Sequence, residues 1–448
     1  MPELQTKLMN TQTRNAARKH VPVPQIPARG EAGQPETIEI GLLTGGTDKP
    51  YAFGLAMALL STNVCMDFIG SDEVDSPELR AASKLNFLNL RGNQNSNVSL
   101  TTRVSRVLAY YARLIRYAAT ARPQIFHILW NNKFEFFDRT LLLLYYKVLG
   151  KKIVLTAHNV NAATRDSKDT WLNRLTLRIQ YRLADHIFVH TEKMRQELIE
   201  NFRVSRQRAT VIPFGINNSV PDTDLTPAEA KRRLGIRDGE RTILFFGRIR
   251  PYKGLEYLVD AFHRITARRQ DYRLIIAGQP KKGSEKYIEE IRQTIRSNGQ
   301  DKIIQKMEYI PDDQTEVYFK AADVLVLPYT DVFQSGVLFL GYGFGLPVVA
   351  ADVGSLKDDV IEGTTGFLCR PTDTDDLARS IETYFDSEIY KDLDRRRPQI
   401  RDYASQRHSW NVVGRMTRSV YTDLLEKRPA GDGSRALNGL TKGNAGPE

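Results

Sequence analysis

The sequence predicts an α/β protein of two doubly wound, Rossmann-like domains that face a shared cleft. Three observations lead to this fold class. The chain has 448 residues, enough for two or three domains of roughly 100 to 200 residues each. Short, nearly continuous apolar runs alternate with helical patterns, which is typical of parallel sheets covered on both faces. This alternation occurs twice, before and after a polar, turn-rich segment at residues 215–225.

Ten apolar runs mark the predicted strands. In chain order they are residues 38–45, 125–130, 152–158, 186–191, 209–214, 242–247, 273–278, 324–329, 347–352 and 366–371. Ligands of doubly wound sheets bind beyond the carboxyl ends of the strands, so the residues that follow these runs are the first candidates for a site.

The predicted strands divide the chain into two domains of similar size. We expect an N-terminal domain over residues 37–218, a second domain over 219–408 and a final helix over 409–427. Residues 1–36 and 428–448 lack apolar periodicity and are expected to be disordered tails.

Two local patterns allow closer predictions. Thr226, Pro227 and Glu229 supply an N-cap, a proline at the first helical position and a capping-box acid, which together predict the start of a helix. Residues 332–351 carry no charge and have the length of a membrane span. Pro347 would break such a helix at mid-depth, so a buried helix followed by a buried strand is the preferred interpretation.

The composition is that of a soluble globular protein, with 41% apolar and 26% charged residues. The two cysteines, Cys65 and Cys369, are far apart and have no metal-type spacing, which argues against a disulfide scaffold and a cysteine zinc site. A reducing cytosol is the expected setting. The N-terminus shows no apolar core of the length that a secretory signal needs.

The net charge of +11 arises from one segment. Residues 101–182 hold 15 basic and 4 acidic groups, and within them Arg103, Arg106, Arg113 and Arg116 alternate with apolar and aromatic residues at helical spacing. Such a helix suits an anionic membrane surface, where each cation contributes about 1 kcal/mol. The alternative is a cationic, solvated face on ordinary core helices. Nucleic-acid binding is not expected, because no recognition motif accompanies the charge.

The strongest motif is FFGRIRPYKGLEYLVDAF at residues 245–262. A strand ends at Gly247, basic groups follow, and Gly254 opens an amphipathic helix. Gly247 lets the backbone approach a ligand, while Arg248 and Lys253 can direct two positive charges at a diphosphate. From spacing alone, a basic loop with a glycine turn remains an equal alternative.

This segment resembles the donor-binding loop of GT-B glycosyltransferases, especially the large family four group. Further resemblances follow in order along the chain, and together they cover nearly all of residues 38–426. They are the glycine turn AGQP with Gly278 (277–280), the loop, helix and strand of 309–329, the core segment 344–371 and the last helix at 409–425. The resemblance implies a nucleotide-sugar-binding C-terminal domain, an acceptor-side N-terminal domain and a last helix that crosses back to it.

One departure from the family pattern concerns two glutamates, separated by seven intervening residues, that contact the donor sugar and the ribose. Alignment on FGLPVV puts these positions at Val332 and Leu340, so neither acid is present. In their place, Gln334, Ser335, Gly336 and Val337 form a turn at the start of the predicted buried helix. Its free N–H groups are expected to bind the distal phosphate, unless it is a plain helix start. Because the missing acids belong to the retaining pattern, retention and inversion both stay open.

The N-terminal half offers a second set of candidates. Residues 42–59 read as a strand, a glycine turn and a helix, and Gly45 and Gly46 would let that turn lie close to the substrates. The spacing is not that of a dinucleotide-binding fingerprint, and ordinary turn glycines are the alternative. His158 ends a predicted strand at a position similar to the family histidine that faces the donor sugar, so it is the leading catalytic candidate. His127, inside an apolar run, is a weaker one.

An inverting enzyme would need a base, and Asp48, Asp166 and Asp169 are the candidates, each otherwise a solvated loop acid. Two D-x-D spellings at residues 222–224 and 373–375 raise the question of a metal. The first lies in the predicted linker and the second is expected to cap a helix, so no metal is predicted.

We therefore predict a metal-independent hexosyltransferase that uses a nucleotide diphosphate sugar as co-substrate and needs no other cofactor. Its acceptor is expected to be a saccharide or a polyprenyl-linked sugar in bacterial polysaccharide or glycoconjugate synthesis. The expected location is cytoplasmic, peripheral on the inner face of the cell membrane. Two alternatives are a catalytically degenerate GT-B subunit that binds a partner or a nucleotide, and a GT-B nucleotide-sugar epimerase.

Overall fold

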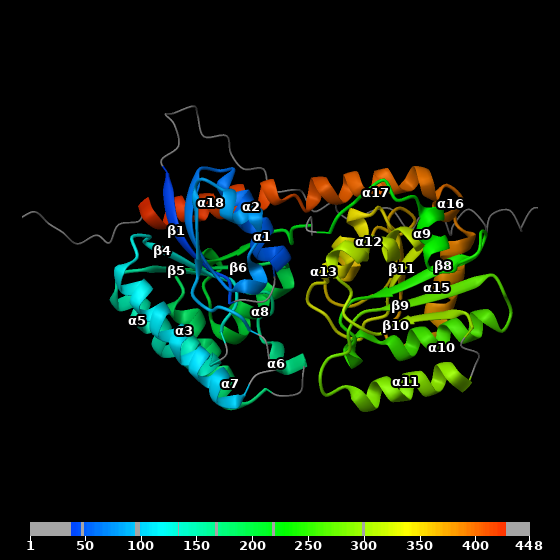
Figure 1. Cartoon of the computed structure of the whole chain (residues 1–448), viewed down its shortest axis with the longest axis horizontal. Coiled ribbons are helices and arrows are strands. Elements are labelled where there is room, and N and C mark those ends of the chain that lie inside the picture. The colour runs from blue at the N-terminus through cyan, green and yellow to red at the C-terminus, as the bar shows by residue number, and fades with distance from the viewer. Residues whose placement is uncertain are drawn as a thin grey trace, which may run out of the picture. The chain divides into compact units, whose positions relative to one another are not determined.

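A computed structural model describes residues 37–45, 49–94, 99–132, 134–165, 169–216, 220–297 and 301–426. Within these residues the strands form two sheets, and every strand pair is parallel. Figure 1 shows helices on both faces of each sheet. The predicted fold class of two doubly wound α/β domains is confirmed.

The first sheet has seven strands in the order β3-β2-β1-β4-β5-β6-β7. Their bounds are β1 Ile38–Leu43, β2 Val64–Gly70, β3 Leu85–Asn89, β4 Ile125–Ile128, β5 Lys152–Thr156, β6 His186–Val189 and β7 Ala209–Val211. The helices around it are α1 Lys49–Leu60, α2 Pro77–Ala81, α3 Leu100–Thr120, α4 Glu135–Phe137, α5 Leu143–Val148, α6 Ala162–Arg165, α7 Trp171–Leu183 and α8 Glu192–Phe202. A π-helical turn, Asp138–Leu142, joins α4 to α5.

The second sheet has six strands in the order β10-β9-β8-β11-β12-β13. Their bounds are β8 Arg241–Phe246, β9 Tyr272–Ala277, β10 Ile303–Lys306, β11 Val324–Leu327, β12 Val348–Ala351 and β13 Gly366–Cys369. The accompanying helices are α9 Pro227–Arg233, α10 Leu255–Thr266, α11 Glu285–Ser297, α12 Asp312–Ala321, α13 Gly336–Gly343, α14 Leu356–Asp359, α15 Thr374–Asp386, α16 Glu388–Lys391 and α17 Leu393–Arg407.

All ten predicted strands are present, and the structure adds β2, β3 and β10. β3 and β10 lie at sheet edges and bury only part of their side chains, so their apolar runs are broken. β2 carries Asp67 in its middle, and the carboxylate accepts a hydrogen bond from the Tyr117 hydroxyl at 2.8 Å. The charge of Asp67 interrupts the apolar run of β2, so this strand does not stand out in the sequence.

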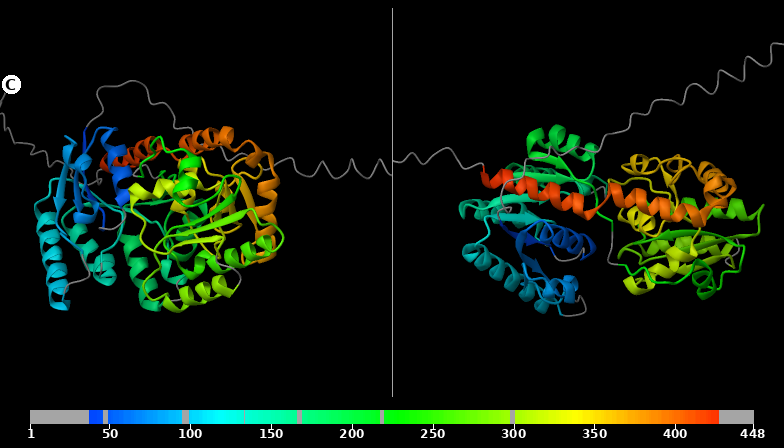
Figure 2. Two further views of the ribbon diagram at one scale, coloured as in Figure 1. Left: turned by 45° about the vertical axis from the view of Figure 1, so that its right-hand side comes forward. Right: turned by 90° about the horizontal axis from the view of Figure 1, so that it is seen from above.

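The last helix, α18 (Trp410–Glu426), packs on α1 of the N-terminal half. A Cβ at Gly414 would lie 2.7 Å from the Ala58 carbonyl oxygen, so the two helices approach backbone to backbone. Figure 2 shows this red helix beside the blue elements of the N-terminal half. The Tyr421 hydroxyl also lies 2.6 Å from His127 Nδ1, which ties α18 to β4.

The predictions of a helix start at Thr226 and of a buried helix and strand within residues 332–351 are confirmed. Thr226 and Glu229 form a reciprocal capping box at the start of α9. The uncharged segment 332–351 contains the buried helix α13 and then the buried strand β12, with the chain turning at a left-handed Gly345 between them. Among the described helices, none is both long enough and apolar enough to cross a bilayer.

Candidate active site

Four of the residues predicted to bind the donor meet at the carboxyl ends of β8 and β9. We call Gly247, Lys253, Gly278 and Val337 the donor cluster. Gly247 has a φ of +100°, and a Cβ there would lie 3.0 Å from Lys253 Nζ and 3.1 Å from a Val337 methyl carbon. Only a glycine leaves this space, so the lysine and the start of α13 both face the backbone at position 247.

Gly278 completes the donor cluster from β9. Its φ is +140°, and a Cβ there would lie 2.1 Å from the Gly247 carbonyl oxygen. The Gly247 N–H donates to the Ala277 carbonyl at 2.9 Å, which holds the two turns together. Two glycine turns therefore stack backbone on backbone, an approach that side chains at these positions would prevent.

Lys253 is the buried cation of the donor cluster. Its residue is 8% exposed, and Nζ lies 5.2 Å from the centre of the Tyr329 ring. Burial lowers the pKa of Lys253 to about 8, and the nearby charges of Arg250 and Arg248 act in the same direction. Within the described part of the chain, no carboxylate forms an ion pair with this ammonium group. A buried cation without a counter-ion favours an anionic ligand.

The turn before α13 combines a side-chain contact to α14 with backbone amides that have no intrahelical acceptor. Ser335 is the N-cap but makes no side-chain cap, so the first amides of α13, those of Gly336 and Val337, have no intrahelical acceptor. Gln334 behaves differently, because its amide nitrogen donates to the Asp359 carboxylate at 3.3 Å. Burial raises the pKa of Asp359 to about 7. The Gln334 side chain thus holds the turn against α14, while the backbone amides of the next residues remain candidates for phosphate binding.

The two positions at which the family has glutamates are apolar and inside the protein. Val332 is 5% and Leu340 is 6% exposed. The sequence reading overlooked Asp331, one residue before Val332, which is exposed. Its charge helps to raise the pKa of Glu197 on α8, so this acid faces the N-terminal half. Asp331 is the nearest carboxylate in sequence to the missing first glutamate.

His158, the leading catalytic candidate, lies in an aromatic cage. Its ring stacks on Trp130 with ring centres 4.3 Å apart and planes at 2°. Tyr51 meets it edge-on at 4.5 Å. Burial lowers the pKa of His158 well below its ordinary value, and the neighbouring His190 lowers it further. The imidazole is therefore neutral at physiological pH.

Hydrogen bonds fix which His158 nitrogen carries the proton. The Ile212 carbonyl can only accept, so His190 Nδ1, at 3.3 Å, must donate to it. Burial lowers the pKa of His190 to about 4, which leaves its Nε2 as an acceptor for His158 Nδ1 at 3.2 Å. His158 Nε2 is then an unprotonated acceptor, and it has no partner among the described residues.

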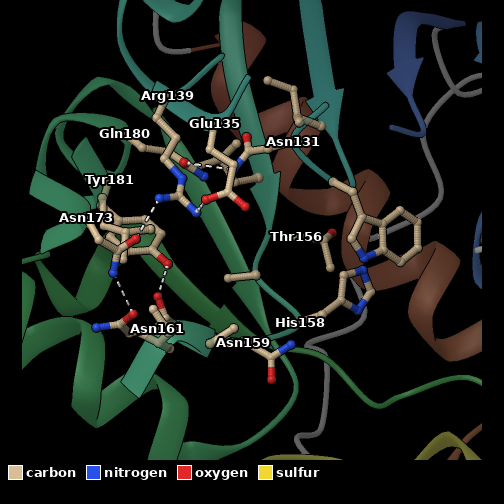
Figure 3. Close-up of a pocket in the computed structure, with 18 of the residues that line it drawn as sticks. Asn131, Glu135, Arg139, Thr156, His158, Asn159, Asn161, Asn173, Gln180 and Tyr181 are labelled. Carbon is tan, nitrogen blue, oxygen red and sulfur yellow. Dashed lines mark hydrogen bonds and ion pairs between the residues drawn. The ribbon is translucent and has the colours of Figure 1, made fainter. Parts of the chain in front are cut away.

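His158 also lines a cavity of about 490 Å³ in the N-terminal half. We call it the N-terminal cavity, and Figure 3 shows its polar lining. It lies at the carboxyl ends of β4 and β5, and α4, α6 and α7 contribute to its walls. Its polar lining side chains are Asn131, Glu135, Arg139, Thr156, His158, Asn159, Asn161, Asn173, Gln180 and Tyr181. The sequence reading found only His158 in this set. Asn131, three residues beyond β4, and Asn159 and Asn161, three and five residues beyond β5, are the signal it missed.

The other N-terminal candidates differ in their surroundings. Gly45 has a φ of +60°, and a Cβ there would lie 2.6 Å from the Trp130 carbonyl oxygen, so this turn touches the end of β4. Gly46, Asp48 and Asp166 lie outside the described residues. Hydrogen bonds from Asn173 and Arg174 lower the pKa of Asp169 to about 2, which makes it a weak base.

His127 is part of the core. Its two ring nitrogens contact the hydroxyls of Tyr421 at 2.6 Å and Thr156 at 2.8 Å, and burial lowers its pKa to about 3. With both nitrogens engaged, it has no free atom for a substrate.

The D-x-D acids are engaged with the chain itself. Asp222 pairs with Lys320 at 2.9 Å and with Arg401 at 3.0 Å. Asp373 caps α15 by accepting from the Asp376 N–H at 2.9 Å. Across the described ranges, no group of three or more His, Cys, Asp or Glu side chains is arranged to hold a metal ion.

Comparison with known proteins gives each half of the chain the same kind of match. Residues 71–220 match Glycosyltransferase Family 4, and residues 240–387 match Glycosyl transferases group 1. Sucrose-phosphate synthase from Thermosynechococcus elongatus superposes with a TM-score of 0.68 at 17% identity, over 87% of this chain and 99% of that one. The chain is a GT-B glycosyltransferase of group 1. HepE of Anabaena, solved in complex with UDP-glucose, shares the glycosyltransferase's fold with a TM-score of 0.66 at 16% identity, over 87% and 100%.

Curated relatives of the glycosyltransferase share less than a third of their residues with it. The D-inositol 3-phosphate glycosyltransferase of Corynebacterium aurimucosum is 27% identical over 286 residues, 61% of this chain and 66% of that protein. The protein of the same name from Corynebacterium efficiens is 27% identical over 246 residues, 53% and 58% of the two chains. The alignments span less than two thirds of either relative.

Proposed function

We propose that this glycosyltransferase moves a hexose from a nucleoside diphosphate sugar to a saccharide or polyprenyl-linked acceptor in bacterial polysaccharide or glycoconjugate synthesis. The observation that carries the proposal is Lys253, a buried cation beside the glycine turn at Gly247 and the start of α13. That HepE was solved with UDP-glucose supports a uridine nucleotide as the first donor to test.

The donor cluster would act by stabilising the leaving group. Negative charge develops on the diphosphate as the bond to the sugar breaks, and fixed positive groups lower the energy of that state. Lys253 and the exposed Arg248 supply two charges, and the Gly336 and Val337 amides supply dipoles. Because the chain's own cations stand at the diphosphate, we expect transfer to need no metal ion.

His158 would contact the donor sugar as a neutral hydrogen-bond acceptor. Its Nε2 is buried and has no partner among the described residues, so it is the atom left to accept from a sugar hydroxyl, while the Trp130 stack and the His190 bond fix the ring. A base with so low a pKa removes protons poorly at neutral pH. Positioning, rather than proton transfer, is therefore its proposed role.

Two alternatives make different predictions for the same protein. A degenerate subunit would have no need for an unpaired cation at position 253, which disfavours it. An epimerase would change a nucleotide sugar with no acceptor present, so product analysis of the donor alone separates it from a transferase.

Nucleotide binding tests the donor cluster. We expect UDP-glucose, in a panel with GDP- and ADP-glucose, to raise the melting temperature of the wild-type protein, because a ligand of the native state stabilises it. Lys253→Ala should weaken this binding by about tenfold or more, the effect of losing one charged hydrogen bond. Lys286→Ala, which removes an exposed lysine on α11, is the control. If no nucleotide sugar stabilises the wild type, the donor site is wrongly assigned.

We further propose that the N-terminal half docks on an anionic membrane surface on the cytoplasmic side. Among the described residues, eleven of the fourteen exposed large apolar side chains lie between positions 100 and 172. Leu100, Val104, Leu108 and Ile115 fall along one side of α3, and Tyr145 on α5 donates to the Ile115 carbonyl at 3.2 Å, so the two helices adjoin. The exposed arginines Arg103, Arg106, Arg113 and Arg116 lie on the same helix, and their charge complements anionic lipids.

Vesicle binding tests the membrane surface. The wild type should sediment with vesicles that contain phosphatidylglycerol and less with phosphatidylcholine alone. Leu108→Ser with Leu144→Ser should reduce binding by about tenfold or more, since each buried CH₂ contributes about 0.8 kcal/mol. Tyr309→Ser with Ile361→Ser removes exposed apolar groups from the C-terminal half and should change nothing. Equal losses in both pairs would contradict the proposed surface.

A further inference from the structure

Amide side chains make up half of the polar lining of the N-terminal cavity. Asn131 follows β4, Asn159 and Asn161 follow β5, and Asn173 and Gln180 come from α7. An amide carries both a donor and an acceptor, and a sugar hydroxyl does the same. A ligand with many hydroxyls can therefore pair with this lining at several points at once.

The amides are held in place by one another. Asn131 donates to the Gln180 carbonyl oxygen at 3.1 Å, and Asn173 donates to the Asn161 carbonyl oxygen at 3.0 Å. Within the described chain, no hydrogen bond engages the remaining Asn131 oxygen or the Gln180 nitrogen. The lining is thus pre-organised, and it keeps polar atoms free for a ligand.

The charged lining residues neutralise each other. Arg139 Nη2 lies 2.6 Å from Glu135 Oε2, and Arg139 Nη1 donates to Asn173 Oδ1 at 2.8 Å. Figure 3 shows the guanidinium between these two partners. The arginine's side chain is 12% exposed and the glutamate's is 61% exposed. A phosphate that approaches Arg139 Nη2 would meet the Glu135 carboxylate, whose charge would repel it.

We infer that the N-terminal cavity binds the acceptor as an uncharged, hydroxyl-rich sugar ring, and that the Glu135–Arg139 ion pair excludes anionic acceptors. The inference rests on the proposed function and names the substrate class of its acceptor side. The cavity, at about 490 Å³, falls within the roughly 300–1,000 Å³ of small-molecule sites. His158 belongs both to its wall and to the candidate active site, which brings a bound sugar to the place of transfer.

This acceptor chemistry differs from the one in the names of the curated relatives, which specify D-inositol 3-phosphate. In this chain Arg139, the one arginine that lines the cavity, is already paired with the Glu135 carboxylate. If Glu135 is the group that enforces the difference, removing its charge should open the cavity to phosphates.

Ligand-detected NMR with the full-length protein tests the inference without requiring turnover. The probes are the methyl glycosides of glucose, galactose and mannose, and as charged counterparts D-inositol 3-phosphate and glucose 6-phosphate. The wild type should bind at least one methyl glycoside and neither phosphate. Glu135→Gln should bind a phosphate about tenfold or more tightly than the wild type, because Arg139 gains a free charge. Glu192→Gln, which removes an exposed ion-paired acid on α8, is the control and should bind like the wild type.

The outcomes separate this inference from the proposed function. A wild type that binds either phosphate better than every methyl glycoside, or an unchanged preference in Glu135→Gln, overturns the inference. UDP-glucose affinity, measured on the same samples, reports the donor site independently and should be the same in Glu135→Gln and the wild type. Saccharide binding without any nucleotide-sugar binding would keep the cavity's ligand class and reject the transferase.

Discussion

The donor cluster and the N-terminal cavity differ in what they offer a ligand. The donor cluster offers a buried ammonium group beside two closely packed glycine turns at Gly247 and Gly278. The N-terminal cavity offers amides and hydroxyls, and its one cation is neutralised by Glu135. One region suits a compact anion, and the other suits an uncharged polyol.

The difference predicts how each region tolerates change. Where a single group carries the interaction, its loss removes most of the binding energy, whereas a network of neutral hydrogen bonds loses about 1 kcal/mol for each member. The glycines of the donor cluster also have no room for a side chain, because a Cβ would meet Lys253 and Val337 at position 247 and the Gly247 backbone at position 278. We therefore expect the largest effect from a backbone change in the donor cluster.

Gly278→Ala should have the largest effect. The residue's φ of +140° is open to glycine alone, and the new Cβ would lie 2.1 Å from the Gly247 carbonyl oxygen. We expect a loss of about 3 kcal/mol or more in the free energy of unfolding, from backbone strain and overpacking together. Chemical denaturation measures it, and UDP-glucose binding should fail in the same variant.

Gly283→Ala is the matched control for this experiment. Its φ is +87°, also left-handed, but nothing lies within 4 Å of the added carbon. It should cost about 1 kcal/mol, the backbone part alone. Equal losses in the two variants would mean that the close contact between the turns is not important.

His158 lines the N-terminal cavity and is proposed to contact the donor sugar. Its replacement should have the next largest effect. We expect His158→Leu to lower kcat by about a hundredfold, near 2.7 kcal/mol, without changing donor affinity. His158→Gln, which keeps an acceptor, should recover part of the loss. Because the pKa of His158 is well below its ordinary value, kcat should show no inflection near pH 6.5 in the wild type.

An inflection near pH 6.5 that disappears in His158→Leu would contradict the neutral, positioning role. His263→Leu, on α10 of the other half, is the control. It should leave kcat unchanged.

The sequence predicted the donor cluster better than the cavity for a physical reason. One loop contains Gly247, Arg248 and Lys253. Its sequence alone therefore predicts both a glycine turn and a positive charge, without knowledge of the fold. Gln334 was predicted to bind the donor directly, and its bond to Asp359 depends on where α14 lies, which no local pattern reports.

The cavity was out of reach because its parts are scattered. Asn131, Asn161 and Gln180 come from three separate segments, and an amide alone is an ordinary surface residue. Only the parallel order of β4 and β5 brings the first two together. In the sequence, Glu135 and Arg139 look like an ordinary helical ion pair at i, i+4. Only the structure shows that the pair lines a cavity.

The smallest predicted effect is a dependence of donor binding on pH. The pKa of Lys253 in the free protein is about 8, below its ordinary value of 10.5. As the pH rises from 8 toward 10.5, the folded protein loses this proton before the unfolded chain does, so folding stability should increase.

Donor affinity should move in the opposite direction, since a neutral amine cannot attract the diphosphate. We expect the Kd for UDP to rise by about tenfold in all above pH 8, toward the value of a variant without this charge. Calorimetric titration of wild type and Lys253→Met between pH 7 and pH 10 measures this, and the variant should give a flat, weaker profile. If the two profiles run parallel, the cation that binds the diphosphate is not Lys253, and the contrast between a charged donor cluster and a neutral cavity would have to rest on the exposed Arg248 alone.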